Sequence, residues 1–150
     1  MTTIAYKDGI IAYDSRSTES NGFIFDDHKN KNYVRDNLVF FGAGPSSDII
    51  SLIDCFIEGK VIYDTPIEAV CFVYDRDKRK LLKTGIMEEP RLHLWWLELE
   101  QSKVYALGSG HDLAIAAMDY GATAEEAVRY AATRDCFTGG DIWTFKLDDR

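Results

Sequence analysis

The spacing of apolar residues changes period along the chain, and this change constrains the fold more than any other feature of the sequence. Runs of β-prone residues are interrupted by three stretches of helical spacing. Strands are expected at 3–6, 10–13, 37–41, 69–74, 80–87, 92–99, 104–107 and 142–147. A helix is expected from Ser46–Asp48 to Gly59, a second at 111–120 and a third at 123–131. The order is therefore strands, one helix, strands, two helices and a last strand.

Local signals mark several ends of these elements. Gly9 supplies the tight turn of a first hairpin, and Gly59 and Gly121 end helices. Thr123 and Glu126 have the spacing of a capping box. Apolar faces are expected at Ile49, Ile50, Ile53, Phe56 and Ile57, at Leu113, Ala116, Ala117 and Tyr120, and at Ala124, Ala127, Val128 and Ala131. These elements predict an α+β fold in which helical layers enclose two mainly antiparallel sheets.

Length and composition limit the classes of protein to consider. The 150 residues, 46% of them hydrophobic, predict a single domain spanning 1–150 with its own core. No apolar run is long enough to cross a membrane and no secretory signal is readable, so a cytoplasmic protein is expected. The net charge of -8 argues against nucleic acid and anionic membranes as partners, because phosphates would be repelled.

Cysteine and histidine offer no metal site. The three cysteines and the three histidines lack metal-ligand spacing. We therefore expect the cysteines to be small apolar residues in a reduced protein, and the histidines to be structural or surface residues. No phosphate-binding glycine loop is present, and no cofactor is expected.

Five short segments, in this order, carry the functional signal. The chain opens Met1-Thr2-Thr3, and Asp14-Ser-Arg-Ser-Thr18 follows the first hairpin. Gly42-Ala-Gly44 lies ahead of the first helix. Gly108-Ser-Gly110 precedes the second helix, and Arg134-Asp-Cys-Phe-Thr-Gly-Gly140 follows the third.

Together these segments resemble the proteasome β-subunits and their bacterial relative HslV, over essentially the whole chain. The resemblance implies the N-terminal-nucleophile (Ntn) hydrolase fold, a four-layer αββα sandwich. The family usually has two long helices after the Gly42–Gly44 element, where this sequence predicts one. A reduced first helical layer, and an assembly smaller than a sealed proteolytic barrel, are therefore expected.

The resemblance also implies roles for individual residues. Thr2 would be the nucleophile, Asp14 would hold a lysine charged and aimed, and the Gly44 N–H would face the oxyanion. Ser109 and Asp135 would support the Thr2 amine, and Thr18 would hold the substrate as an added strand. From the residues alone other roles stay open. Thr2 could be an ordinary strand residue, Asp14 a turn residue, Gly44 a strand end, and Ser109 and Asp135 helix caps.

The lysine has two candidates. The family's lysine precedes the glycine element by slightly over a dozen residues, and both Lys29 and Lys31 fit this spacing. In an extended segment both would point to the same face. The neighbouring residues give a small preference for Lys31.

An N-terminal threonine carries a nucleophile and a base on one residue. Its hydroxyl is a poor nucleophile until a base takes the proton, and an α-amine with a pKa of about 7.7–8.0 can do so. A nearby lysine cation would lower that pKa further. This chemistry requires removal of Met1, because otherwise the Thr2 nitrogen is an amide.

The leading hypothesis is a threonine-type peptidase or amidase that acts on peptides or proteins, in a homo-oligomer. The alternatives are a catalytically inactive assembly or binding subunit and an amidase for small molecules. An ATPase unfoldase partner is implied by the resemblance to HslV, but no docking element is readable in the sequence.

Overall fold

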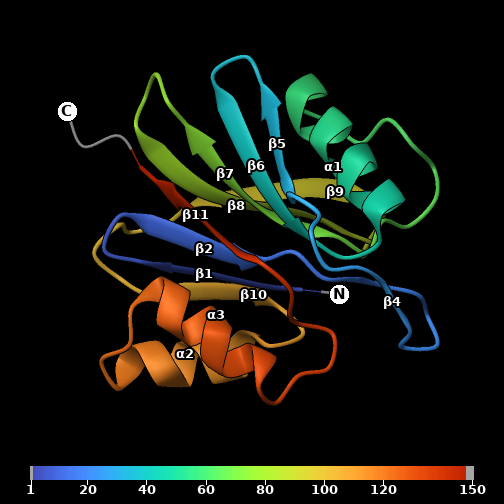
Figure 1. Ribbon diagram of the computed structural model, residues 1–150. Helices are drawn as coiled ribbons and strands as arrows, with labels where there is room; N and C mark the ends of the chain where they lie inside the picture. Colours follow the sequence, from blue (N-terminus) through green and yellow to red (C-terminus); the bar gives the residue numbers. More distant parts are fainter. Residues whose placement is uncertain (1, 148–150) are drawn as a thin grey trace. The chain divides into compact units, whose positions relative to one another are not determined.

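The computed structural model describes residues 2–147, which divide into two compact units (Figure 1). Among the described residues, the first unit combines 2–31 with 100–147. The second unit spans Asn32–Leu99.

The first unit is built on a four-stranded antiparallel sheet in the order β10-β1-β2-β11. The bounds are β1 Thr3–Lys7, β2 Ile10–Asp14, β10 Tyr105–Gly108 and β11 Ile142–Lys146. Asp8 and Gly9 have φ of 52° and 78°, as a two-residue hairpin turn requires. The predicted first hairpin is confirmed.

Two helices cover one face of this sheet, α2 (His111–Asp119) and α3 (Ala124–Ala132) (Figure 1). Small side chains let the layers approach closely, and the core contains Ala5, Ala12, Ala114, Met118, Ala124, Ala127 and Val128. Thr123 and Glu126 form both hydrogen bonds of the predicted capping box. The predicted buried face of α3 is also confirmed.

The predicted face of α2 was wrong in part, since Ala117 packs against the core but other predicted residues do not. Ala114 and Met118 are buried, whereas Ala116 is exposed and Tyr120 is 97% exposed. Apolar residues surround much of this helix, so their pattern does not select one face. Contact with the sheet selects it.

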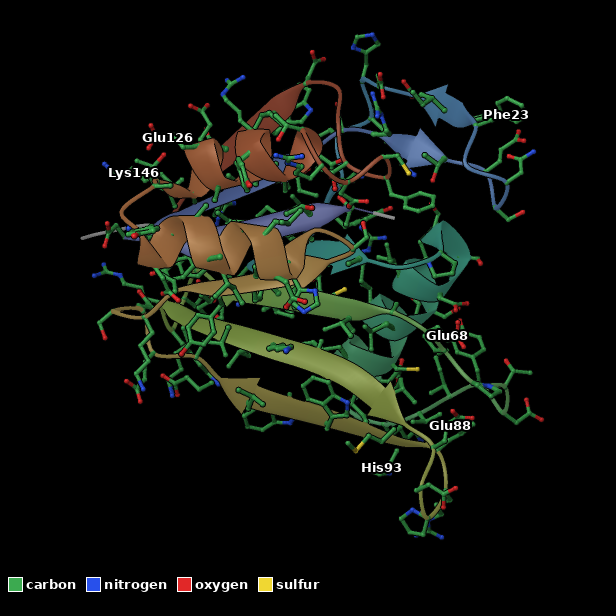
Figure 2. The ribbon with its side chains drawn as sticks, turned by 90° about the horizontal axis from the view of Figure 1, so that it is seen from below. Phe23, Glu68, Glu88, His93, Glu126 and Lys146 are labelled. Atoms are coloured by element: carbon green, nitrogen blue, oxygen red, sulfur yellow. The ribbon has the colours of Figure 1, made fainter. Side chains whose placement is uncertain are left out.

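A short hairpin completes the first unit and was missed by the sequence pattern. It pairs β3 (Ser17–Thr18) with β4 (Ile24–Asp26) through an irregular register. Strands of two and three residues are too short to show alternation. Phe23 lies in its turn, is 71% exposed and points away from the fold (Figure 2).

The second unit is a five-stranded antiparallel sheet in the order β5-β6-β7-β8-β9. The bounds are β5 Asn32–Arg35, β6 Leu38–Ala43, β7 Val70–Asp75, β8 Lys80–Met87 and β9 His93–Glu98. Strand β5 was not predicted, because its polar residues Asn32 and Arg35 hide the β pattern. His93 opens β9 (Figure 2).

Helix α1 (Ser46–Glu58) connects β6 to β7 and ends at Gly59, which has a φ of 77° (Figure 1). It is the only helix between these strands, as the sequence predicted. Its buried residues are Ile49, Leu52, Ile53 and Cys55, which pack against the sheet residues Phe40, Cys71 and Val73. Ile50 and Ile57 share the helical spacing of these residues but lie on the solvent side of the helix.

Within residues 2–147, no helix combines the length and the apolar character that crossing a bilayer requires.

Candidate active site

Thr2 lies directly before β1 and is only 2% exposed. Its main chain is set by the pairing of the next residue, Thr3, with Gly108 of β10. A side chain on Gly108 would collide with the Thr2 carbonyl group. The glycine therefore allows the start of β1 to lie closely against β10.

Asp14 ends β2 and is fully buried. One carboxylate oxygen accepts hydrogen bonds from the Thr2 hydroxyl and, at 3.1 Å, from the Thr3 backbone N–H. The other accepts from the backbone N–H groups of Gly139 at 2.9 Å and Arg16 at 3.3 Å. A buried carboxylate with this many donors is held in one orientation.

Lys31 brings a cation to the same place. Its Nζ donates to Thr2 Oγ1 at 2.7 Å, to Asp14 Oδ1 at 3.1 Å and to the Arg16 carbonyl at 2.5 Å. Burial lowers the pKa of Lys31, and the Asp14 carboxylate opposes that effect. Nearby positive charge on Lys29 and Arg16 lowers the same pKa further.

Lys29 occupies a different place from Lys31. Its backbone N–H donates to the Ser15 carbonyl at 3.2 Å. The segment that carries both lysines is not an extended strand, because β4 ends at Asp26 and β5 begins only at Asn32. Residues two apart point to the same face only in an extended strand, so this rule does not apply to Lys29 and Lys31 in the irregular segment between β4 and β5.

Ser109 and Asp135 meet on another side of Thr2. Ser109 Oγ lies 3.3 Å from the Thr2 carbonyl oxygen and 2.5 Å from Asp135 Oδ2. The same Asp135 oxygen accepts from Thr138 Oγ1 at 2.7 Å, and Thr138 Oγ1 also lies 2.7 Å from Thr3 Oγ1. A chain of hydroxyls thus connects Asp135 to both residues at the start of β1.

The pKa of Asp135 reflects this network. Burial acts to raise it, but hydrogen bonds from Ser109, Thr138 and the Phe137 N–H outweigh burial and lower it below its usual value. Asp135 is therefore a carboxylate at neutral pH, able to accept several hydrogen bonds at once.

The remaining two candidates are Thr18 and Gly44. Thr18 is in β3, opposite Ile24. Gly44 belongs to the second unit, where it follows β6 with a φ of 130°. A side chain there would crowd the backbone of Glu68 and Ala69, so the position requires glycine. The oxyanion role of the Gly44 N–H stays a prediction.

Sequence reasoning assigned no role to Thr3, Thr138, Gly108 and Gly139, which the structure places in the same network. For Thr138 and the two glycines a signal existed, because they stand inside the quoted segments. Thr3 also stands inside one of these segments, but a threonine in a β-strand is ordinary and its type alone indicates no role.

The arrangement can activate a hydroxyl. A buried ammonium that donates to Thr2 Oγ1 stabilises negative charge developing on that oxygen. Asp14 neutralises the ammonium and orients it. A proton acceptor close to Thr2 Oγ1 would complete the set of groups that a nucleophile needs.

Comparisons with known proteins match the whole chain by structure. The chain superposes on Thiobacillus denitrificans BPH with a TM-score of 0.67 and 18% identity, covering 99% of both chains. The same protein in complex with epoxomicin gives 0.67 and 19%, covering 98% of both. Eukaryotic HslV from Trypanosoma brucei gives 0.64 and 19%, covering 97% of this chain and 98% of that one. No protein-family model matches the sequence, and no curated protein matches it significantly. These structures confirm the α+β Ntn-hydrolase fold that the motifs predicted.

Proposed function

We propose that this chain, which has the fold of the HslV and proteasome β-subunit family, is a threonine-type Ntn hydrolase with Thr2 as its nucleophile. One observation carries the proposal. Lys31 Nζ lies 2.7 Å from Thr2 Oγ1 and 3.1 Å from the fully buried carboxylate of Asp14. An ammonium in this position would stabilise negative charge that develops on the Thr2 oxygen during a reaction.

In the proposed reaction, removal of Met1 frees the Thr2 amine. The neutral amine takes the proton of Oγ1, directly or through one water, and Oγ1 attacks the carbonyl carbon of an amide. The protonated amine then gives its proton to the leaving nitrogen as the C–N bond breaks, and an ester on Thr2 remains. Water activated by the same amine hydrolyses the ester and restores the hydroxyl.

The surrounding residues lower the cost of each proton transfer. The Lys31 charge favours the neutral form of the amine and stabilises the alkoxide, while Asp14 holds the ammonium in place. Ser109, Asp135 and Thr138 would orient the freed amine from the side of the Thr2 carbonyl. By resemblance to the family alone, the oxyanion N–H is assigned to Gly44.

Covalent labelling tests the nucleophile. The preparation uses a cleavable N-terminal fusion that leaves Thr2 as the first residue, and the probe is epoxomicin, which is bound in the Thiobacillus denitrificans BPH structure. An epoxyketone offers two electrophilic carbons, and the hydroxyl and amine of one threonine can react with both. We expect one adduct by intact mass, located on Thr2 by peptide mapping.

Three variants make the result specific. Thr2→Ser retains a hydroxyl and should be labelled, whereas Thr2→Ala should not. Cys136→Ser removes an exposed thiol that could itself react with an epoxide, and it should be labelled like the wild type. An unlabelled wild type, with Thr2 as first residue and no hydrolysis of peptides or small amides, would refute the proposal in favour of an inactive assembly subunit.

The substrate class, the oligomeric state and the cellular location are inferred from the resemblance in fold. We infer peptide or protein substrates, a homo-oligomer and a cytoplasmic location. Turnover of fluorogenic peptides compared with that of small amides distinguishes a peptidase from a small-molecule amidase. Light scattering of the purified protein measures the number of copies in the assembly.

A further inference from the structure

Arg16 stands inside the Asp14–Thr18 segment, yet its side chain has no part in the proposed reaction. Its guanidinium donates two hydrogen bonds to the Asp27 carboxylate, from Nε at 2.8 Å and from Nη2 at 3.2 Å. Nη1 donates to the Cys136 carbonyl at 3.1 Å. One side chain therefore binds two segments that lie more than 100 residues apart in the sequence.

One of these segments leads to Asp14. The Arg16 guanidinium lies across Gly139, where a Cβ would come within 2.5 Å of its central carbon. Gly139 in turn donates its N–H to Asp14 Oδ2 at 2.9 Å, and its carbonyl accepts from the Ser15 N–H at 3.2 Å. The Arg16 side chain thus packs against Gly139, whose N–H is one of the donors that orient Asp14.

The other segment leads to Lys31. Residues 27–31 belong to no strand, so sheet pairing does not fix their path. The Asp27 carbonyl is held by the Ser15 hydroxyl and by the Asp141 N–H, the latter at 3.1 Å. Asp27 lies four residues before Lys31. Its carboxylate accepts hydrogen bonds from Arg16, so both its side chain and its main chain are held by other segments.

We infer that Asp27 is a positioning residue, whose ion pair with Arg16 holds the Lys31 segment in register with the Asp14 carboxylate and the Gly139 loop. The inference rests on the proposed function. Asp27 touches neither Thr2 nor the reacting atoms through any hydrogen bond found in residues 2–147. It acts through Arg16 and through the chain that leads to Lys31.

The pair has an electrostatic consequence besides a geometric one. Asp27 balances the charge of Arg16, which lies close enough to Lys31 to influence its titration. The other charged groups that act on Asp27 are His28, which pairs with Asp141, and Lys31 itself. Asp27→Asn would leave Arg16 unbalanced, so the potential at Thr2 would become more positive and the pKa of a free Thr2 amine would fall.

The test measures labelling of the Thr2-first protein by epoxomicin as kinact and KI, over a range of pH. For Asp27→Asn we expect kinact to fall by about tenfold with KI changed by less than about twofold, because a displaced Lys31 affects reaction more than binding. The acidic limb of the pH profile should also move to lower pH. Arg16→Lys should lower kinact similarly, since an ammonium cannot form the forked pair. The double variant should be no slower than the slower single variant.

Two further variants separate positioning from general damage. His28→Gln removes an exposed ion pair with Asp141 that joins the same two segments, and we expect wild-type kinetics. Asp27→Glu retains the charge and should leave the acidic limb in place even if its kinact falls. Denaturation midpoints confirm that each variant is folded.

The outcomes distinguish this inference from the proposed function. A wild type that is not labelled at Thr2 contradicts the function itself. A labelled wild type, with Asp27→Asn matching His28→Gln in both kinact and pH profile, overturns the role of Asp27 alone. Additive losses in the double variant would also overturn it, because they would show that Arg16 and Asp27 act separately.

Discussion

Gly108→Ala provides a direct test of how the start of β1 is positioned. Gly108 has a φ of 95°, and a Cβ there would overlap the Thr2 carbonyl oxygen and lie 2.7 Å from the carbonyl carbon. Ordinary contacts of a Cβ begin at 3.4 Å. The oxygen is the closer of the two atoms, so the Thr2 carbonyl group would have to retreat by more than about 1 Å, and Thr2 Oγ1 would move relative to Lys31.

Gly121→Ala is the matched control. Gly121 also has a positive φ, 112°, but a Cβ there would meet no atom within 4 Å. Both substitutions place a side chain in a backbone conformation that costs about 1–3 kcal/mol. Only Gly108→Ala adds overpacking against Thr2, which we expect to cost a further ~1–3 kcal/mol.

Urea denaturation measures the two free energies of unfolding, and labelling of Thr2 by epoxomicin measures the effect on the site. Gly121→Ala should lose stability and keep the wild-type labelling rate. Gly108→Ala should lose more stability and label roughly 10- to 100-fold more slowly, because displacements of this size misalign reacting groups. Equal stability and equal labelling of the two variants would refute the packing argument.

Three other substitutions have expected outcomes that follow from single contacts. Lys31→Met leaves the buried Asp14 charge without its cation and should cost about 3 kcal/mol in urea denaturation; an unchanged midpoint would contradict this. Asp135 has a lowered pKa in the folded protein, so its contribution to stability is complete above pH 3.8 and is lost as pH falls through the lower folded value. The Asp135→Asn variant should therefore lose less stability than the wild type as the pH falls below 3.8. Parallel curves of stability against pH for the two proteins would contradict the lowered pKa of Asp135. Thr123→Ala breaks the capping box with Glu126 and should cost about 1 kcal/mol, read from the thermal or urea midpoint.

Much of the fold was predictable because its signals are local. The Asp8-Gly9 turn, the Thr123–Glu126 box and the Gly59 helix end each depend on residues within one turn of chain. Elements without such signals were missed, as β5 and the β3–β4 hairpin show. The buried face of α2 was predicted only in part for a related reason, since an apolar helix does not specify which side meets the sheet.

The sequence by itself determined the order of strands and helices and the residue types of the candidate site, through segments that resemble one family. Only the tertiary structure decided which lysine contacts Thr2, since Lys29 and Lys31 are equivalent by spacing. The contact between the Thr3 and Thr138 hydroxyls likewise joins residues 135 positions apart in the sequence. The physical reason is the sequence separation of the residues involved, because turns and helix caps depend on neighbouring residues. The burial of Asp14 and its hydrogen bond from Gly139 instead require distant segments of the chain to come together, which no local sequence pattern encodes.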